Sequence, residues 1–253
     1  MIQNQEVGNI FPDNPYLQKV LAKSLDHINR DFEKLKDVPL SDRPNLALGS
    51  VFENLASQEI LEKHPETEQQ KEVRQIVEDM FQNADKITGK KWISKPDFVS
   101  VIFDKQGRMI IDEVIEFKTS AAAFNKKKDR QPQNSLYTVD TMVNLINDMN
   151  RTEKLQDLPA FQALNSLPDG QTLLTQIFNR IKSLNLKEEV KLSENLIYHV
   201  RTLNGVFIEP PHLNLSVGRG DKKRMVRIRF SNSAFNLKNC LNIIDHYAEN
   251  NIE

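Results

Sequence analysis

Two acidic residues and one lysine stand at neighbouring ends of two predicted β-strands. Asp97 opens the first strand, and Glu116 and Lys118 close the second. The strands are runs rich in β-branched and aromatic residues, 97–104 and 109–118, and the short segment between them contains glycine, as is typical of a β-hairpin. Carboxylates gathered at one end of a hairpin are ligands for a hard divalent cation.

The expected register of this hairpin brings the three side chains together. With Gln106 and Gly107 as the two central turn residues, Asp97 faces Glu116 across the strand pair. Side chains alternate along a strand, so Lys118 lies on the same face as Glu116. The opposite face is expected to carry Phe98, Ile102, Ile111, Ile115 and Phe117.

The rest of the face with the three charges is apolar, which indicates central strands covered on both sides. Its expected residues are Val99, Val101, Ile110 and Val114. Burying two carboxylates and an amine without a further partner would cost several kcal/mol, and a bound divalent cation would compensate for that cost. The structural alternative is a buried ion pair at a strand end.

At this point the sequence resembles a known family. Pro96-Asp97 followed by Glu116-Phe117-Lys118 is similar to the signature of the PD-(D/E)xK nuclease superfamily. The segment from Gly49 to Glu53 is similar to the first helical motif of its RecB-like branch, which includes lambda-type exonucleases. The segment from Gln133 to Tyr137 is similar to the Gln-x-x-x-Tyr motif that opens the helix after the catalytic lysine. The four motifs occur in the order of the family, within residues 46–149.

The resemblance implies a restriction-endonuclease-like α/β core, with a mixed central sheet flanked by helices, and metal-dependent hydrolysis of phosphodiester bonds. Asp97, Glu116, Glu53 and the Phe117 carbonyl would then hold Mg²⁺ or Mn²⁺. Lys118 would position the attacking water or help to deprotonate it.

By the same resemblance, Gln133 and Tyr137 would help to hold the site and the DNA strand. Two departures from the family pattern matter. Glu53 stands where many RecB-like members have histidine, and its carboxylate suits a hard cation. Cys240 is the only cysteine, which excludes the four-cysteine iron–sulfur cluster of some relatives.

Three functions remain open on this core. The first is an exonuclease of RecB-like type that acts on DNA, as single strands or at duplex ends. The second is an endonuclease of restriction or resolvase type. The third is a nucleic-acid-binding module that keeps the fold without cleavage, against which the complete set of Asp97, Glu116 and Lys118 argues.

Two basic clusters are candidates for contacts with DNA phosphates, because phosphate neutralisation by lysine and arginine dominates nucleic-acid affinity. The first follows the second strand of the hairpin: Lys126, Lys127, Lys128 and Arg130. The second lies in a late predicted strand pair: Lys222, Lys223, Arg224, Arg227 and Arg229. Short basic runs are also common on solvated surfaces.

Helical spacing of apolar residues predicts the elements that must position these residues. Helices are expected after the cap at Asn14 and Pro15, and over about 46–64, 73–81, 133–149 and 171–184. A second hairpin is expected to turn at Asn204-Gly205, followed by a strand pair over 212–230 and a helix capped near Ser233. We expect an N-terminal helical segment (1–45), a nuclease core (46–149) and a C-terminal α+β part (150–253) that forms a subdomain or continues the same sheet.

The composition sets broad limits on the class of protein. The chain has 253 residues, 27% of them charged, and a formal net charge of -1, so any attraction to nucleic acid must be local. No run approaches the ~18 apolar residues of a membrane span, and the first residues lack a signal-peptide pattern. With one cysteine, we expect a soluble protein of the reducing cytoplasm without a membrane partner.

Overall fold

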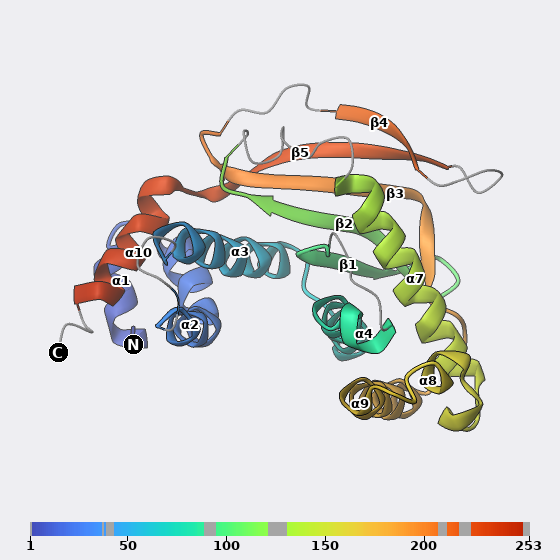
Figure 1. Cartoon of the computed structure of the whole chain (residues 1–253). Coiled ribbons are helices and arrows are strands. Elements are labelled where there is room, and N and C mark those ends of the chain that lie inside the picture. The colour runs from blue at the N-terminus through green and yellow to red at the C-terminus, as the bar shows by residue number, and fades with distance from the viewer. Residues whose placement is uncertain are drawn as a thin grey trace.

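The computed structural model describes residues 2–36, 38, 43–88, 95–120, 131–206, 212–217 and 224–249 (Figure 1). The helices before the sheet are α1 Val7–Ile10, α2 Pro15–Leu35, α3 Arg43–Lys63, α4 Glu68–Gln82 and α5 Ala84–Thr88. The hairpin strands β1 Phe98–Phe103 and β2 Met109–Lys118 are followed by α7 Gln131–Arg151, α8 Pro159–Gln162 and α9 Pro168–Leu184. The last elements are β3 Lys191–Asn204, β4 His212–Val217, β5 Arg224–Asn236 and α10 Leu237–Glu249.

Local sequence signals explain where the early helices begin. The Asn14 side chain accepts a hydrogen bond from the Leu17 N–H at 3.0 Å, and Pro15 occupies the first turn of α2, as predicted. At the start of α4, Thr67 and Gln70 form a reciprocal capping box. These caps satisfy N–H groups that have no partner within the helix.

The strands described by the structure form one mixed five-stranded sheet in the order β1-β2-β3-β5-β4. The outer pairs β1–β2 and β4–β5 are antiparallel, whereas β2, β3 and β5 run parallel to one another. The predicted α/β class, with a mixed sheet flanked by helices, is therefore present. The strands that follow residue 190 continue the sheet that the hairpin begins.

Two sequence predictions about the later elements were wrong. The chain forms no hairpin at Asn204-Gly205, because β3 ends there and pairs only with β2 and β5 among the described strands. Ser233 lies within β5, and α10 begins four residues later, where Asn236 and Asn239 exchange side-chain to backbone hydrogen bonds. The predicted strand pair over 212–230 is confirmed as β4 and β5.

The hairpin turn also differs from the prediction. The Asp104 N–H donates to the Arg108 carbonyl at 2.9 Å, which leaves a three-residue loop whose last residue, Gly107, has a φ of 76°. This loop shifts the pairing near the turn by one residue, and a β-bulge at Asp112 shifts it back. As a result Ile111 lies on the face with Val101, contrary to the prediction, and Ile110 lies on the other.

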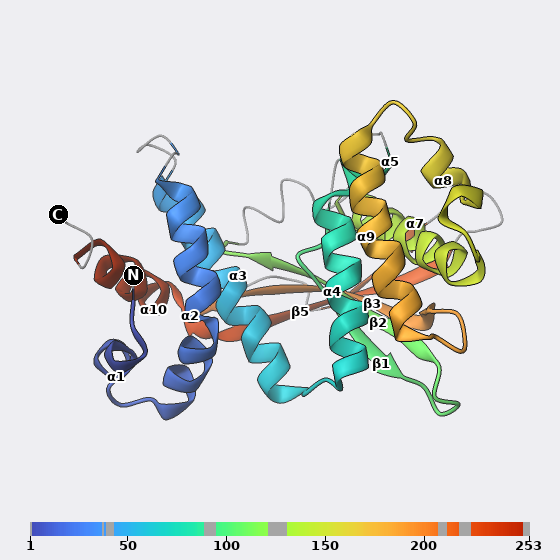
Figure 2. The same cartoon turned by 90° about the horizontal axis from the view of Figure 1, so that it is seen from below.

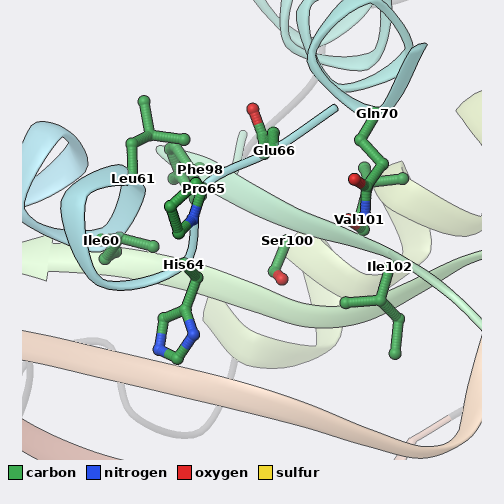
Figure 3. Close-up of a pocket in the computed structure, with 10 residues that line it drawn as sticks. All are labelled: Ile60, Leu61, His64, Pro65, Glu66, Gln70, Phe98, Ser100, Val101 and Ile102. Carbon is green, nitrogen blue, oxygen red and sulfur yellow. Dashed lines mark hydrogen bonds between the residues drawn. The ribbon is translucent and has the colours of Figure 1, made fainter. Parts of the chain in front are cut away.

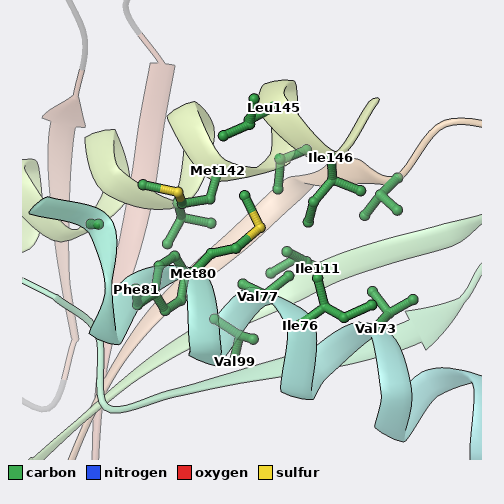
Figure 4. Packing of buried hydrophobic residues seen from close by; sticks show 14 of the residues in the cluster. Val73, Ile76, Val77, Met80, Phe81, Val99, Ile111, Met142, Leu145 and Ile146 are labelled. Carbon is green, nitrogen blue, oxygen red and sulfur yellow. The ribbon is translucent and has the colours of Figure 1, made fainter. Parts of the chain in front are cut away.

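Each face of the sheet has its own apolar cluster. Helices α4 and α7 cover one face, where Val77, Met80 and Met142 pack against Val99 and Ile111 (Figure 4), and α9 packs against these two helices away from the strands (Figure 1). Helices α1, α2, α3 and α10 gather at one end of the sheet, at the left of Figures 1 and 2, and enclose the second cluster with Phe98, Ile115 and Phe117. None of the described helices combines the length and apolar character that a membrane span requires.

Candidate active site

The hairpin register brings Asp97, Glu116 and Lys118 together, as predicted. The pairs Phe98–Ile115 and Val99–Val114 place Asp97 opposite Glu116. The Lys118 ammonium lies 2.7 Å from a Glu116 carboxylate oxygen and 3.9 Å from an Asp97 oxygen. The Phe117 N–H also fixes Asp97, because it donates a hydrogen bond to Asp97 Oδ2 at 2.7 Å.

Glu116 is almost fully buried, with 1% of its surface exposed, and both of its carboxylate oxygens are hydrogen-bonded. Oε2 accepts from Gln131 Nε2 at 2.7 Å as well as from Lys118, and Oε1 accepts from Ser135 Oγ at 2.9 Å. Gln131 and Ser135 stand one turn apart on α7, so the first turn of this helix faces the carboxylate. Hydrogen bonds to the charged form make the burial of Glu116 tolerable.

Glu53 joins this group from α3, on the other side of the hairpin end. Burial, together with the negative charges of Asp31 and Glu116, raises the pKa of Glu53 from 4.5 to about 7 against the lowering effect of Lys118. The pKa of Asp97 is raised well above its usual value by burial and by the charges on Glu116 and Glu53. Three carboxylates therefore share one region that holds a single ammonium group among the described residues.

Lys118 is stabilised in its charged form. Burial alone lowers the pKa of Lys118, but the negative charges on Glu116 and Asp97 outweigh burial and raise the pKa above its usual value. The ammonium also donates to the Phe117 carbonyl at 3.2 Å. At neutral pH the side chain is thus a cationic hydrogen-bond donor rather than a proton acceptor.

The structure does not bring Gln133 and Tyr137 to the carboxylates as the motif implied. Both side chains are exposed on α7, Tyr137 with 65% of its surface. Two residues along an α-helix correspond to about 200° of rotation, so Gln133 points away from the side on which Gln131 lies. Gln131 and Ser135 of the same helix contact Glu116 instead.

Tyr198 is a further site residue that sequence reasoning missed. It lies on β3, opposite Val114 of β2, and is fully buried beneath the carboxylates. Burial and the charge on Glu116 raise the pKa of its hydroxyl well above the usual value. Its signal in the sequence was weak, because a lone tyrosine within an apolar run does not reveal which strand lies beside it.

A second buried acid, Glu59, anchors α3 to the sheet. Its carboxylate accepts hydrogen bonds from Ser233 Oγ at 2.6 Å and from the Ala234 N–H at 3.1 Å, both on β5. The Arg201 guanidinium of β3 lies 2.8 Å from the same carboxylate. These contacts fix the orientation of α3 and thereby hold Glu53, six residues earlier, against the end of the hairpin.

The basic clusters are only partly described. Lys126, Lys127, Lys128, Arg130, Lys222 and Lys223 lie outside the described residues, as does the side chain of Arg224. Arg227 and Arg229 are exposed on β5, and Arg229 lies 3.6 Å from Glu113. Because Val226 and Ile228 pack in the cluster on the α7 side, these arginines project from the opposite face to Glu116 and Lys118.

A separate pocket lies between the end of α3, the start of α4 and β1 (Figure 3). His64 and Ser100 line it together with apolar residues such as Ile60 and Phe98. It contains none of the predicted catalytic residues.

Within the ranges that the structure describes, no group of three or more His, Cys, Asp and Glu side chains is arranged as a ready metal site.

Comparison of the chain with protein-family models, curated proteins and solved structures gave no match in any of the three. The case for a function therefore depends on the residues themselves.

Proposed function

We propose that the chain is a divalent-metal-dependent deoxyribonuclease, an exonuclease of RecB-like type. The observation that carries the proposal is the convergence of Asp97, Glu116 and Lys118 at one hairpin end, with Glu53 added from α3. The order of elements also fits the resemblance: a helix with Glu53, the hairpin, then a helix whose first turn contacts Glu116.

The chemistry of the donor set fits Mg²⁺ or Mn²⁺. Asp97, Glu116, Glu53 and the Phe117 carbonyl offer oxygen ligands, which hard cations prefer. The surplus of carboxylates over ammonium groups raises the pKa of Asp97 and Glu53, so added positive charge would be favourable there. A bound ion would supply a water of lowered pKa and stabilise the leaving oxygen.

The roles of the protein's own residues follow from their contacts. Lys118, held by Glu116 and the Phe117 carbonyl, would orient the attacking water and offset negative charge on the phosphate. Gln131 and Ser135 would fix both oxygens of Glu116 in place. Gln133 and Tyr137 are exposed on α7, and their role would be contact with a DNA strand.

Two observations favour a second candidate, a nucleic-acid-binding module without cleavage. Lys118 already neutralises Glu116 at 2.7 Å, and the described acidic residues form no ready metal site. In that case the cluster would be a buried ion pair that stabilises the strand end. An endonuclease on the same core has the same site and differs in the DNA that it accepts.

Digestion assays separate these functions. End-labelled linear DNA and closed circular DNA are incubated with the protein and Mn²⁺, with EDTA and the Asp97→Asn variant as controls. Loss of linear DNA alone supports the exonuclease, and nicking of circles means an endonuclease. If neither substrate is cut while both are bound, the binding module replaces the proposal.

A further inference from the structure

The carboxyl ends of the three parallel strands carry a row of polar side chains that starts at the candidate active site. Lys118 of β2 is level with Thr202 of β3, and Thr202 is level with Asn232 of β5. Two residues earlier, Glu116, Val200 and Phe230 are level in the same way. Val200 and Phe230 pack in the cluster on the α7 side, so the row projects from the same face as Glu116.

Thr202 and Asn232 differ in exposure and form a pair. Thr202 is buried, with 1% of its surface exposed, whereas Asn232 is exposed. The Thr202 hydroxyl donates a hydrogen bond to Asn232 Oδ1 at 2.8 Å. An amide whose oxygen is engaged toward the interior presents its NH₂ group, two hydrogen-bond donors, on the opposite side. The buried threonine therefore fixes which end of the exposed amide is available.

We infer that Asn232, oriented by Thr202, binds a backbone phosphate of the nucleic acid next to the one held at Lys118. Two strand spacings, about 10 Å, separate β5 from β2, so Asn232 lies beyond the cleaved phosphate and not on it. A neutral donor suits this position, since it can bind a phosphate oxygen without competing for the carboxylates of the site. Thr202 is a positioning residue and does not contact the strand.

This inference rests on the proposed nuclease function but predicts a distinct signature. Asn232→Ala should raise the KM for DNA about tenfold, the contribution of one hydrogen bond to a charged group, and leave kcat within about twofold. Asn232→Asp should raise KM further, because a carboxylate repels the phosphate. Thr202→Val, which keeps the shape but removes the hydroxyl, should raise KM in the same direction by a smaller factor.

The loss of a neutral donor also has a characteristic salt dependence. Counterion release depends on the charges that contact phosphates, so Asn232→Ala should weaken binding by a constant factor at every salt concentration. Titrations of labelled DNA in EDTA measure this factor without hydrolysis. Asn195→Ala is the matched control, since Asn195 is exposed at the other end of β3 and should bind and cleave as the wild type does.

The outcomes distinguish failure of the inference from failure of the proposed function. A wild type that cleaves, with an Asn232→Ala variant whose KM is unchanged, overturns the inference alone. If the wild type does not cleave, the proposed function fails, and the titrations in EDTA still decide the phosphate contact. Equal affinity of wild type and Asn232→Ala there would overturn it. Melting temperatures of all variants check that each one folds.

Discussion

Ser135 Oγ donates a hydrogen bond to Oε1 of Glu116 across 2.9 Å, in a part of the molecule where neither side chain reaches solvent. With Gln131 and Lys118 on Oε2, the carboxylate has a donor on each oxygen. The helix that follows the hairpin thus does more than cover the sheet. It sets the orientation of the central acid of the site.

The hydrogen bonds from α7 predict unequal effects of two neighbouring glutamines. Ser135→Ala should lower the free energy of unfolding by about 2 kcal/mol, because it leaves Oε1 of the buried Glu116 without its donor. Gln131→Ala should lower it by about 1 kcal/mol, because Lys118 still donates to Oε2. Cleavage should fall about tenfold as Glu116 loses its fixed orientation. Gln133→Ala is the control and should unfold like the wild type in urea. Equal destabilisation by all three changes would contradict the arrangement.

The three central charges should be individually essential for cleavage. Asp97→Asn, Glu116→Gln and Lys118→Met should each reduce kcat by at least about a hundredfold, and the double change Asp97→Asn with Glu116→Gln should be hardly worse. Single-turnover rates under matched conditions measure this. Retention of full activity in any single variant would remove that residue from the mechanism.

The same residues should behave differently in stability measurements. Lys118→Met leaves the buried Glu116 carboxylate without its counter-ion and should cost about 3–5 kcal/mol of unfolding free energy. Adding Glu116→Gln should restore much of that loss, since the unpaired charge is then gone. A double-mutant cycle in urea measures the coupling, and additive losses would show that the pair does not interact.

Metal binding should appear as thermal stabilisation. An ion that binds only the folded chain adds about 2.7 kcal/mol at a hundredfold excess over its Kd. We therefore expect Mn²⁺ to raise the Tm of the wild type and to leave that of Asp97→Asn nearly unchanged. Scanning calorimetry with and without Mn²⁺ tests this. The same rise in both proteins would place the ion elsewhere.

The raised pKa of Glu53 predicts how stability depends on pH in metal-free protein. A carboxyl group with a pKa near 7 in the folded chain and 4.5 in the unfolded chain stays protonated up to a higher pH in the folded chain. The contribution of this protonated carboxyl group to the free energy of unfolding is fully present below about pH 4.5 and is lost as the pH rises through 7. Between pH 5 and 8 the wild type should lose roughly 1–3 kcal/mol more than Glu53→Gln. Urea unfolding in EDTA measures the difference, and parallel pH curves would refute it.

The exposed arginines of β5 predict a change in salt dependence. If Arg227 and Arg229 contact phosphates, replacing both with alanine should reduce the slope of log K against log salt by roughly 0.7 to 0.9 for each contact. The rate at saturating DNA should stay close to that of the wild type, since both project from the sheet face opposite to Glu116. An unchanged slope would identify them as solvated surface residues.

The hairpin shows what alternation along strands can and cannot predict. Asp97 faces Glu116 as expected, although the turn has three residues instead of two, because the bulge at Asp112 compensates for the extra residue. Either irregularity alone would have moved Asp97 out of register with Glu116. No local feature of the sequence predicts the bulge. Together with the turn, it exchanges the faces on which Ile110 and Ile111 were expected.

The helix after the hairpin shows a different limit. Helical spacing predicts which residues share a side of α7, but not which side faces the carboxylate. Gln131 and Ser135 have the same spacing as Gln133 and Tyr137, and only tertiary contacts decide between the two sets. The missing hairpin at Asn204-Gly205 has a similar cause, since β3 takes its partners β2 and β5 from distant parts of the chain.

The contacts of Glu59 with Ser233 and Ala234 join parts of the chain 174 and 175 residues apart. During synthesis on the ribosome, α3 emerges long before β5, and β2 before its neighbour β3. Until those strands are made, α3 lacks the contacts of Glu59 with Arg201, Ser233 and Ala234 that fix its orientation on the sheet. Pairings of this range form slowly. The proposed nuclease would therefore remain inactive toward nearby nucleic acid until β5 has been synthesised.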